Sequence, residues 1–362
     1  MLFNKELTKI KIYQPGKPIE EVKRSLHLKE VYKLASNEIP FAPTYIKKSI
    51  LKELKNINRY PQSDCFYLRK IIAKKFNVLP EQIIFGNGSD EIITLCVRAF
   101  IKRGDEVIVA YPTFLIYEIQ SRISGAKIVR VPLKNFKYDL TGMLDRITKR
   151  TKIIFIANPD NPTGTYLNKE EISNFLQNVN GNILVFFDEA YSEFAPKDFP
   201  NTIKFLQKKS NIIFTKTFSK IYGLAGLRIG YGISSKEIVS VLNKVREPFN
   251  VNRFAQVAAI EVLKNQAFFK KVLSYIQKEK NWLYEQLKNL DINFIESATN
   301  FILIKISNAK NCSNYLLKKG IIVRELSGWG LKDFIRVTVG MHKENQLFIE
   351  HLKNYLTKFK GG

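Results

Sequence analysis

Short apolar runs alternate with amphipathic segments through the middle of the chain. Seven runs are rich in β-branched and aromatic residues, and the segments between most of them repeat apolar residues at helical spacing. This alternation is typical of an α/β fold, in which helices cover a mostly parallel sheet. The expected strands lie at residues 82–85, 106–110, 127–131, 152–157, 183–187, 211–215 and 228–232, and the clearest helices at 91–101, 115–124 and 169–179.

The pattern changes near residue 252. A long helical stretch follows to about residue 290, and then a smaller α+β pattern with strands at 301–306, 321–324 and 334–339 and helices around 312–319 and 343–359. A chain of 362 residues exceeds the roughly 250–300 residues at which single cores stop growing. We therefore predict an N-terminal arm over 1–40 that packs with the small domain or a partner subunit, a large domain over 41–265 and a small domain over 266–362.

The composition is that of an ordinary globular protein, although its charge is strongly positive. Lys and Arg number 58 against 33 Asp and Glu, which gives a net charge of +25, and 44 of the 58 are lysines spread along the chain. Scattered lysines favour a solvated surface over a nucleic-acid-binding protein, which is kept as the alternative from a different class. No apolar run approaches the length of a membrane span, so we expect no membrane partner.

Cysteine and histidine are scarce, with three residues of each type. The cysteines are too few for a disulfide framework and wrongly spaced for zinc, and no histidine lies in a recognisable motif. We therefore predict no metal site and expect a cytoplasmic protein.

The densest group of chemically useful residues follows the expected strand 211–215. It reads Thr215-Lys216-Thr217-Phe218-Ser219-Lys220, and a glycine-rich turn leads from it to Arg228. Hydroxyls and an arginine suit a phosphate group, and a lysine beside them suits a Schiff base with an aldehyde. A surface turn would explain one lysine in a chain this rich in lysine, but it would not explain the whole segment.

Three further motifs follow strands. Residues 158–164 read Asn-Pro-Asp-Asn-Pro-Thr-Gly, Asp188-Glu189-Ala190-Tyr191 ends the expected strand 183–187, and residues 86–91 form a glycine-rich loop before a helix. Taken alone these are a tight turn, a helix cap and a weak phosphate-binding loop. The loop also lacks the third glycine of a Rossmann fingerprint, which argues against a nucleotide-binding enzyme.

Together the four motifs resemble the fold type I pyridoxal-phosphate enzymes, and within them the histidinol-phosphate aminotransferases. The resemblance covers nearly the whole chain, with further matching segments at 13–21, 34–38, 58–61, 320–324 and 335–340. It implies a large domain with a mostly parallel seven-stranded sheet, a smaller α+β domain, pyridoxal 5'-phosphate as cofactor and a homodimer as the functional unit.

The resemblance also implies residue roles. Lys220 would bind the cofactor as a Schiff base and shuttle a proton, Asp188 would pair with the pyridine nitrogen, and Tyr191 would complete the catalytic set at the phenolic oxygen. The remaining cofactor-binding positions are Asn161 at the same oxygen, Phe114 on the ring, Ser89, Asp90, Thr217, Ser219 and Arg228 around the phosphate, and Tyr60 at the neighbouring subunit's cofactor. The substrate-binding positions are Tyr13 and Arg324 for a substrate phosphate, Arg336 for an α-carboxylate, and Asn37 and Asn161.

The implied reaction exchanges an amino group between histidinol phosphate and 2-oxoglutarate, giving imidazole acetol phosphate and glutamate in histidine biosynthesis. The partners would be these small molecules and a second copy of the chain, without nucleic acid. Two alternatives share the cofactor pocket: a broad-range aromatic aminotransferase and a threonine-phosphate decarboxylase.

Overall fold

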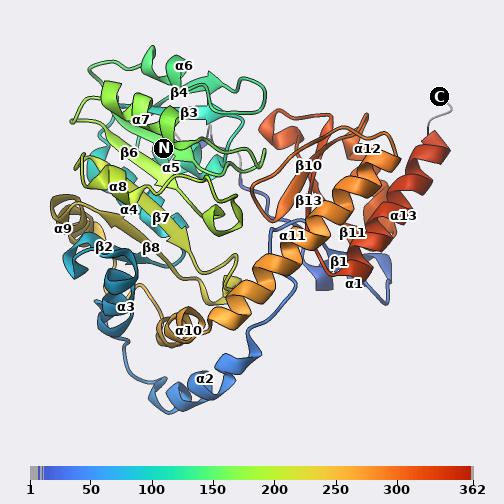
Figure 1. The fold of residues 1–362 in the computed structure, drawn as a ribbon, viewed down its shortest axis with the longest axis horizontal. Helices are drawn as coiled ribbons and strands as arrows, with labels where there is room; N and C mark the ends of the chain where they lie inside the picture. The colour runs from blue at the N-terminus through green and yellow to red at the C-terminus, as the bar shows by residue number, and fades with distance from the viewer. Residues whose placement is uncertain (1–6, 9, 11, 360–362) are drawn as a thin grey trace.

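The computed structural model describes residues 7, 8, 10 and 12–359. Figure 1 shows a larger body built on one sheet and a smaller body beside it, with the long helix α11 (Gln266–Asn289) extending from one to the other. None of the helices in the described ranges is both long and apolar enough to cross a membrane.

The larger body contains a seven-stranded sheet in the order β2-β8-β7-β6-β5-β3-β4. All strands from β7 to β4 run parallel to one another, and β8 runs antiparallel to both of its neighbours, β2 and β7. The strands are β2 (Ile83–Gly86), β3 (Glu106–Tyr111), β4 (Lys127–Pro132), β5 (Thr151–Ala157), β6 (Leu184–Asp188), β7 (Ile212–Thr217) and β8 (Gly230–Ser234).

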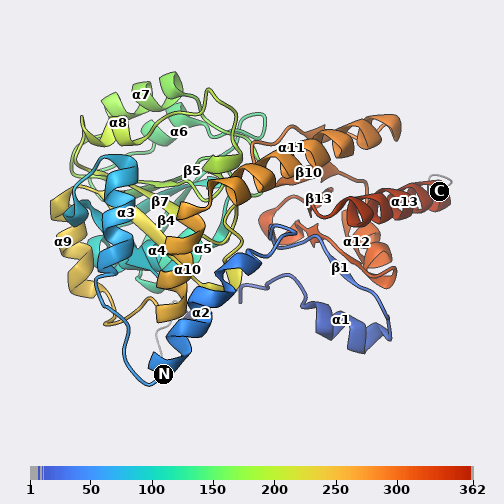
Figure 2. The same ribbon diagram turned by 60° about the horizontal axis from the view of Figure 1, so that its bottom comes forward.

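Helices cover both faces of this sheet. Helix α4 packs against α5 and α9 on one face, and Figure 2 shows α6, α7 and α8 on the opposite face. Because both faces are covered, the central strands β5 and β6 are apolar and buried almost throughout instead of alternating in polarity. These helices are α4 (Ser89–Phe100), α5 (Leu115–Ile123), α6 (Leu140–Leu144), α7 (Lys169–Asn178), α8 (Ile203–Leu206) and α9 (Lys236–Val245).

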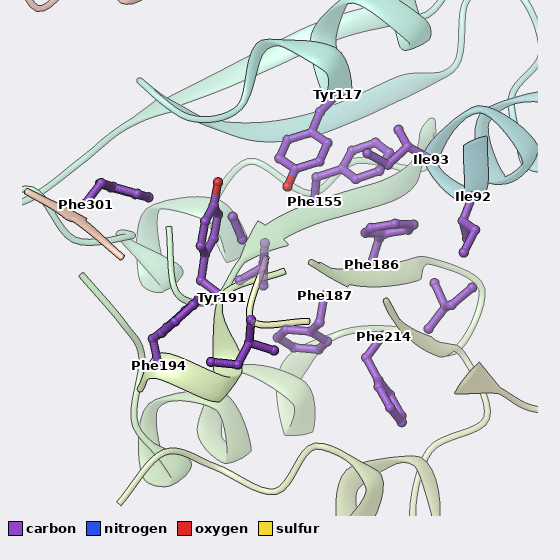
Figure 3. Packing of buried hydrophobic residues seen from close by; sticks show 14 of the residues in the cluster. Ile92, Ile93, Tyr117, Phe155, Phe186, Phe187, Tyr191, Phe194, Phe214 and Phe301 are labelled. Atoms are coloured by element: carbon purple, nitrogen blue, oxygen red, sulfur yellow. The ribbon is translucent and has the colours of Figure 1, made fainter. Parts of the chain in front are cut away.

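Aromatic side chains form the part of the core that packs beside the central strands of the larger body. The ring of Tyr117 stacks on Phe155 with centroids 4.8 Å apart, and Phe186 lies 5.1 Å from Phe155. Figure 3 shows these three rings grouped along the sheet. Their packing holds α5 against β5 and β6, so the side chains at the carboxyl ends of these strands have fixed positions.

Local sequence signals explain how two helices of the larger body begin. Helix α7 starts at a capping box, in which Asn168 accepts from the N–H of Glu171 and the Glu171 carboxylate accepts from the N–H of Asn168. Helix α4 starts after Gly88, which provides no capping side chain. The first N–H groups of α4 therefore need other acceptors, such as an anion.

The smaller body contains a four-stranded antiparallel sheet in the order β12-β13-β10-β9. Strand β11 lies outside it and pairs in parallel with β1 from the N-terminal segment. The elements are β1 (Tyr32–Lys33), β9 (Phe294–Ile295), β10 (Phe301–Lys305), β11 (Ile321–Ile322), β12 (Arg324–Glu325), β13 (Phe334–Thr338), α12 (Ala309–Lys318) and α13 (His342–Phe359).

The N-terminal segment packs on the smaller body. Helix α1 (Ile19–Leu26) places Val22 in a small apolar cluster with Val31, Ala35 and Ile322. The chain then passes to the larger body, where α10 contacts both α2 and α3. These three helices are α2 (Lys47–Glu53), α3 (Phe66–Phe76) and α10 (Arg253–Lys264).

The α/β fold and the mostly parallel seven-stranded sheet are confirmed, and most element ends differ from the expectation by at most three residues. The last strand of the sheet begins two residues late, at Gly230, because Arg228 has a left-handed backbone with φ of 55°. Two differences are larger. The expected strand 321–324 is two short strands, β11 and β12, and the stretch 252–290 is two helices, α10 and α11. The domain boundaries stay a prediction.

Candidate active site

A cavity of about 380 Å³ lies where the carboxyl ends of the large sheet meet the smaller body. Register brings the strand ends together, because Ala157 of β5 pairs with Asp188 of β6, which pairs with Thr215 of β7. Every predicted site residue except Tyr60 lines the cavity: Tyr13, Asn37, Ser89, Asp90, Phe114, Asn161, Asp188, Tyr191, Thr217, Ser219, Lys220, Arg228, Arg324 and Arg336.

Asp188 is a buried carboxyl at the end of β6, with only 7% of its surface exposed. The Tyr117 hydroxyl donates to Oδ2 at 2.7 Å, and the N–H of Ala190 donates to Oδ1 at 3.1 Å. Burial raises the pKa of Asp188 from its ordinary value of 3.8 to about 6, although these two hydrogen bonds oppose the shift. A cationic group bound in the cavity next to Asp188 would stabilise its charged form.

Tyr117 is a site residue that the sequence analysis missed. It is fully buried and lines the cavity beside Asp188. In the sequence it looks like one of many aromatic residues on the apolar face of a helix. The available signal was its position three residues after Phe114, since residues at this spacing lie on the same side of a helix.

Lys220 follows β7 and directs its amino group into the cavity. Its Nζ atom donates to the Ser36 carbonyl at 3.3 Å and lies 5.5 Å from the centre of the Tyr191 ring. The Tyr191 hydroxyl accepts a hydrogen bond of 2.8 Å from Asn37, which is itself buried. Asn37 therefore joins the N-terminal segment to the tyrosine beside the lysine.

The positions predicted for a phosphate form one cradle. Ser89 and Asp90 open helix α4, Thr217 ends β7, and Ser219 follows with its N–H bonded to the Thr217 hydroxyl at 3.1 Å. The guanidinium of Arg228 lies 3.7 Å from the Asp90 carboxylate. Free N–H groups at a helix start, hydroxyls and an arginine together suit a phosphate group.

Two glycines allow the parts of this cradle to approach one another. Gly88 has φ of 82°, and a Cβ atom there would lie 2.7 Å from a guanidinium nitrogen of Arg228. At Gly230 a Cβ atom would lie 2.6 Å from the backbone nitrogen of Ser89. Gly230 requires glycine because a Cβ atom cannot come this close to backbone, and Gly88 favours glycine because its φ lies in the left-handed region.

Arg336 lies on β13, opposite the large sheet, with 6% of its surface exposed. It donates to the Asn161 side-chain oxygen and to the Ala35 carbonyl, the latter at 2.9 Å. Its Nε atom has no hydrogen-bond partner in the described part of the chain. Burial lowers the pKa of Arg336 to about 10, so it remains charged at neutral pH. A buried guanidinium with an unused N–H is suited to binding a carboxylate.

Arg324, on β12, is half-buried and lines the same cavity. One guanidinium nitrogen donates to the Gln14 carbonyl, and the guanidinium lies 5.8 Å from the centre of the Tyr13 ring. Burial lowers the pKa of Arg324. Within the described part of the chain neither Arg324 nor Arg336 forms an ion pair, so this wall of the cavity carries positive charge without a compensating carboxylate.

Two predicted aromatic residues have different positions. Phe114 precedes α5 and lines the cavity, with its ring at 82° to that of Tyr117 and the centroids 5.5 Å apart. Tyr60 does not line the cavity of its own chain. It is 78% exposed and stacks on Phe249 at 4.6 Å. Its role at a neighbouring subunit stays a prediction.

A buried ion pair beside the cavity was also missed. Lys216 precedes Thr217 on β7 and places its Nζ atom 3.0 Å from the Glu189 carboxylate and 3.6 Å from that of Glu193. Because side chains alternate along a strand, Lys216 points away from Thr217. The pair thus links the end of β7 to the residue that follows Asp188. The sequence contained both charges but no indication that they meet.

Comparisons with known proteins agree with this geometry. Residues 29–352 match the family model described as aminotransferase class I and II. A histidinol-phosphate aminotransferase of Moorella thermoacetica is 43% identical over 351 residues, 96% of this chain and 91% of the relative. That of Caldicellulosiruptor saccharolyticus is 43% identical over 358 residues, 98% of this chain and 100% of the relative.

A solved structure is similar over nearly the same length. The histidinol-phosphate aminotransferase of Sinorhizobium meliloti, in complex with pyridoxal-5'-phosphate, superposes with a TM-score of 0.90 at 26% sequence identity. The match covers 99% of this chain and 98% of that one.

We predict that Gly230→Ala disrupts the phosphate cradle. The added methyl group would meet the backbone of Ser89, so β8 or the start of α4 must move, which costs about 1–3 kcal/mol of unfolding free energy. Urea unfolding measures this loss, and stabilisation of the wild-type chain by inorganic phosphate should weaken in the variant. Gly181→Ala, where a Cβ atom meets open space, is the matched control. Equal stabilities of the two variants would contradict the prediction.

We predict that Asp188 makes the fold less stable as pH rises from about 4 to about 6. Its pKa is higher in the folded protein than in the unfolded chain, so the folded state binds this proton more tightly and loses that advantage once the carboxyl ionises. Relative to wild type, Asp188→Asn should gain about 2 kcal/mol of unfolding free energy between pH 4.5 and pH 7.5. Urea unfolding of the ligand-free proteins at both pH values measures the gain, and a constant difference would refute the prediction.

Proposed function

The chain belongs to the class I and II aminotransferase family, and on that premise we propose that it transfers an amino group between histidinol phosphate and 2-oxoglutarate with pyridoxal 5'-phosphate as cofactor. Histidine biosynthesis is the pathway in which this reaction belongs. The main support for this substrate is a pair of arginines that line the cavity, Arg324 and Arg336. Neither of them has a carboxylate partner among the described residues.

The residues present fit the cofactor. Its phosphate is matched by the cradle around the start of α4, where Gly230 leaves no room for a Cβ atom beside the Ser89 backbone. Its pyridine nitrogen is matched by Asp188, a buried carboxyl that lacks a cationic partner. Its aldehyde is matched by Lys220, whose amino group lies in the same cavity. When bound, the cofactor supplies an aldehyde that condenses with amines and a ring that withdraws electrons from the substrate carbon bearing nitrogen.

The chain's own residues supply the rest of the chemistry. Lys220 is the group that holds and moves the proton at the substrate carbon. Asp188, in its charged form, keeps a proton on the ring nitrogen, because ion pairing in a buried site favours the charged state of both groups. Tyr191 is held by Asn37 so that its hydroxyl faces the cavity, and Phe114 lies at the cavity wall as a surface for an aromatic ring.

Arg324 and Arg336 bind two different anions, a phosphate and a carboxylate. The donor carries a phosphate but no α-carboxylate, whereas glutamate and 2-oxoglutarate carry carboxylates. We assign the phosphate to Arg324 with Tyr13, and the α-carboxylate to Arg336 with its unused Nε–H. The names of the similar proteins favour this substrate over the two alternatives, a broad-range aromatic aminotransferase and a threonine-phosphate decarboxylase.

We also propose a homodimer in the cytoplasm. Large apolar side chains are exposed around α2 and α3, close in sequence to Tyr60, and Tyr60 itself is exposed and does not line its own cavity. A second copy would cover this surface and bring Tyr60 to the neighbouring site. The exposed apolar residues are Tyr45, Leu51, Leu54, Ile57, Phe66, Tyr67 and Phe249. The three cysteines are buried free thiols, as suits a reducing compartment.

The experiment that tests the substrate is Arg324→Ala with two amino donors. Loss of a charged contact worth about 2–4 kcal/mol should lower kcat/KM for histidinol phosphate roughly 30- to 1000-fold. Phenylalanine has no phosphate, so its kcat/KM should change far less. Steady-state assays of both donors on one preparation give the ratio, in which general destabilisation cancels.

Arg98→Ala is the matched control, because it removes an arginine that pairs with Glu247 away from the cavity. It should leave the ratio unchanged. Equal losses for both donors in Arg324→Ala would rule out Arg324 as the phosphate anchor and favour the broad aromatic activity.

Subunit complementation tests the dimer. Tyr60→Phe and Lys220→Ala subunits should each be impaired alone, because each lacks a different part of every site. In a mixed dimer, one of the two sites would combine an intact Lys220 with an intact Tyr60 from the other subunit. Activity should therefore rise on mixing and subunit exchange, and sedimentation should give a dimer. A fully active monomer would refute the proposal.

A further inference from the structure

Arg324, the group assigned to the substrate phosphate, lies close to two aromatic rings. Its guanidinium carbon is 4.7 Å from the centre of the Trp329 ring and 5.8 Å from that of Tyr13. Its hydrogen-bond acceptor is a backbone carbonyl, that of Gln14. Both kinds of contact hold a guanidinium without neutralising it, so the full positive charge remains for a dianionic phosphate.

The position of Trp329 is fixed by its surroundings. It is only 4% exposed and packs in an apolar cluster with Leu303 and Leu326. The next residue, Gly330, has φ of 80° and lies against the Tyr111 ring, where a Cβ atom would meet the hydroxyl at 2.6 Å. Among the residues that the structure describes, the indole N–H has no hydrogen-bond partner. The Trp329 side chain therefore contacts Arg324 through the face of its ring.

A second cavity explains why the Arg324 side chain needs the Trp329 ring to hold it in position. It measures about 390 Å³, lies beside the first and is lined by Trp329 and Leu317 among others. Tyr13 and Arg324 line both cavities. A long arginine side chain at this boundary has space on either side, and ordering it loses rotamer entropy. A fixed indole face favours one of these positions.

We propose that Trp329 is a specificity-determining residue that positions Arg324 for the phosphate of the amino donor. This role rests on the proposed function, since it requires a phosphorylated substrate. Trp329 acts through Arg324 and without touching the reacting atoms. Its contribution is therefore uniform binding of a remote group, which appears in KM more than in kcat.

The test replaces Trp329 with Leu and with Phe and compares histidinol phosphate with phenylalanine as donors. A desolvated cation–π contact predicts that Trp329→Leu raises KM for histidinol phosphate about 10- to 30-fold, with kcat and the phenylalanine reaction changed less than about threefold. Trp329→Phe keeps an aromatic face and loses no hydrogen bond, so it should retain most of the preference. If the Leu variant fails to fold, Trp329→Met fills more of the volume and tests the same point.

Two controls separate positioning from packing. Leu352→Ala removes a buried side chain of the smaller body outside this cluster and should affect both donors alike. In the Arg324→Ala background, Trp329→Leu should cause no further loss of preference, because its effect passes through Arg324.

The outcomes distinguish this inference from the proposed function. If Arg324→Ala selectively impairs histidinol phosphate but Trp329→Leu impairs both donors equally, the role of Trp329 is overturned and the function stands. If Arg324→Ala impairs both donors equally, Arg324 does not bind the substrate phosphate, and the proposed role of Trp329 is overturned as well.

Discussion

Three parallel strands, β5, β6 and β7, end side by side, with Ala157, Asp188 and Thr215 paired across them. This register determines where the chemistry can occur, because each strand leads directly into one of the motifs that carry functional side chains. A shift of one residue along β6 would turn Asp188 to the other face of the sheet. The aromatic packing of Tyr117 on Phe155 and the ion pair of Lys216 with Glu189 support the register from both faces.

Several of the charged side chains that line the cavity lack ion-pair partners of opposite charge in the described part of the chain. Over residues 12–359, Asp188 has hydrogen-bond donors but no cation as a partner, whereas Arg336 and Arg324 have neutral acceptors but no carboxylate. Leaving buried charges unpaired costs free energy, and a bound ligand of opposite charge removes that cost. Lys216 and Glu189, which pair with each other, need no ligand and are structural. The presence or absence of an ion-pair partner therefore separates the structural charges from those that are free to bind a ligand.

Residues of the N-terminal segment and of the smaller body complete the active site, whose other residues come from the larger body. Asn37 bonds to Tyr191, and the Ala35 carbonyl accepts from Arg336, which comes from β13 near the other end. Thr338, also on β13, donates to the Asn37 side chain and accepts from its backbone N–H. The short parallel pair of β1 and β11 places the N-terminal segment so that these contacts can form. The cavity is therefore closed only when the smaller body and the N-terminal segment are in place.

The sequence by itself determined the order of strands and helices and the motifs at the strand ends. These depend on residues close together in the chain, through apolar periodicity and through loops such as that before Ser89. Parallel strands end on one edge, so the gathering of Ser89, Asp188 and Lys220 was also predictable, and the resemblance to a family supplied their roles. Tertiary structure alone decided the partners: Tyr117 for Asp188, Glu189 for Lys216, Trp329 for Arg324, and the absence of Tyr60 from its own cavity. Contacts such as these depend on burial and on the packing of separate elements, which a local pattern of residues does not record.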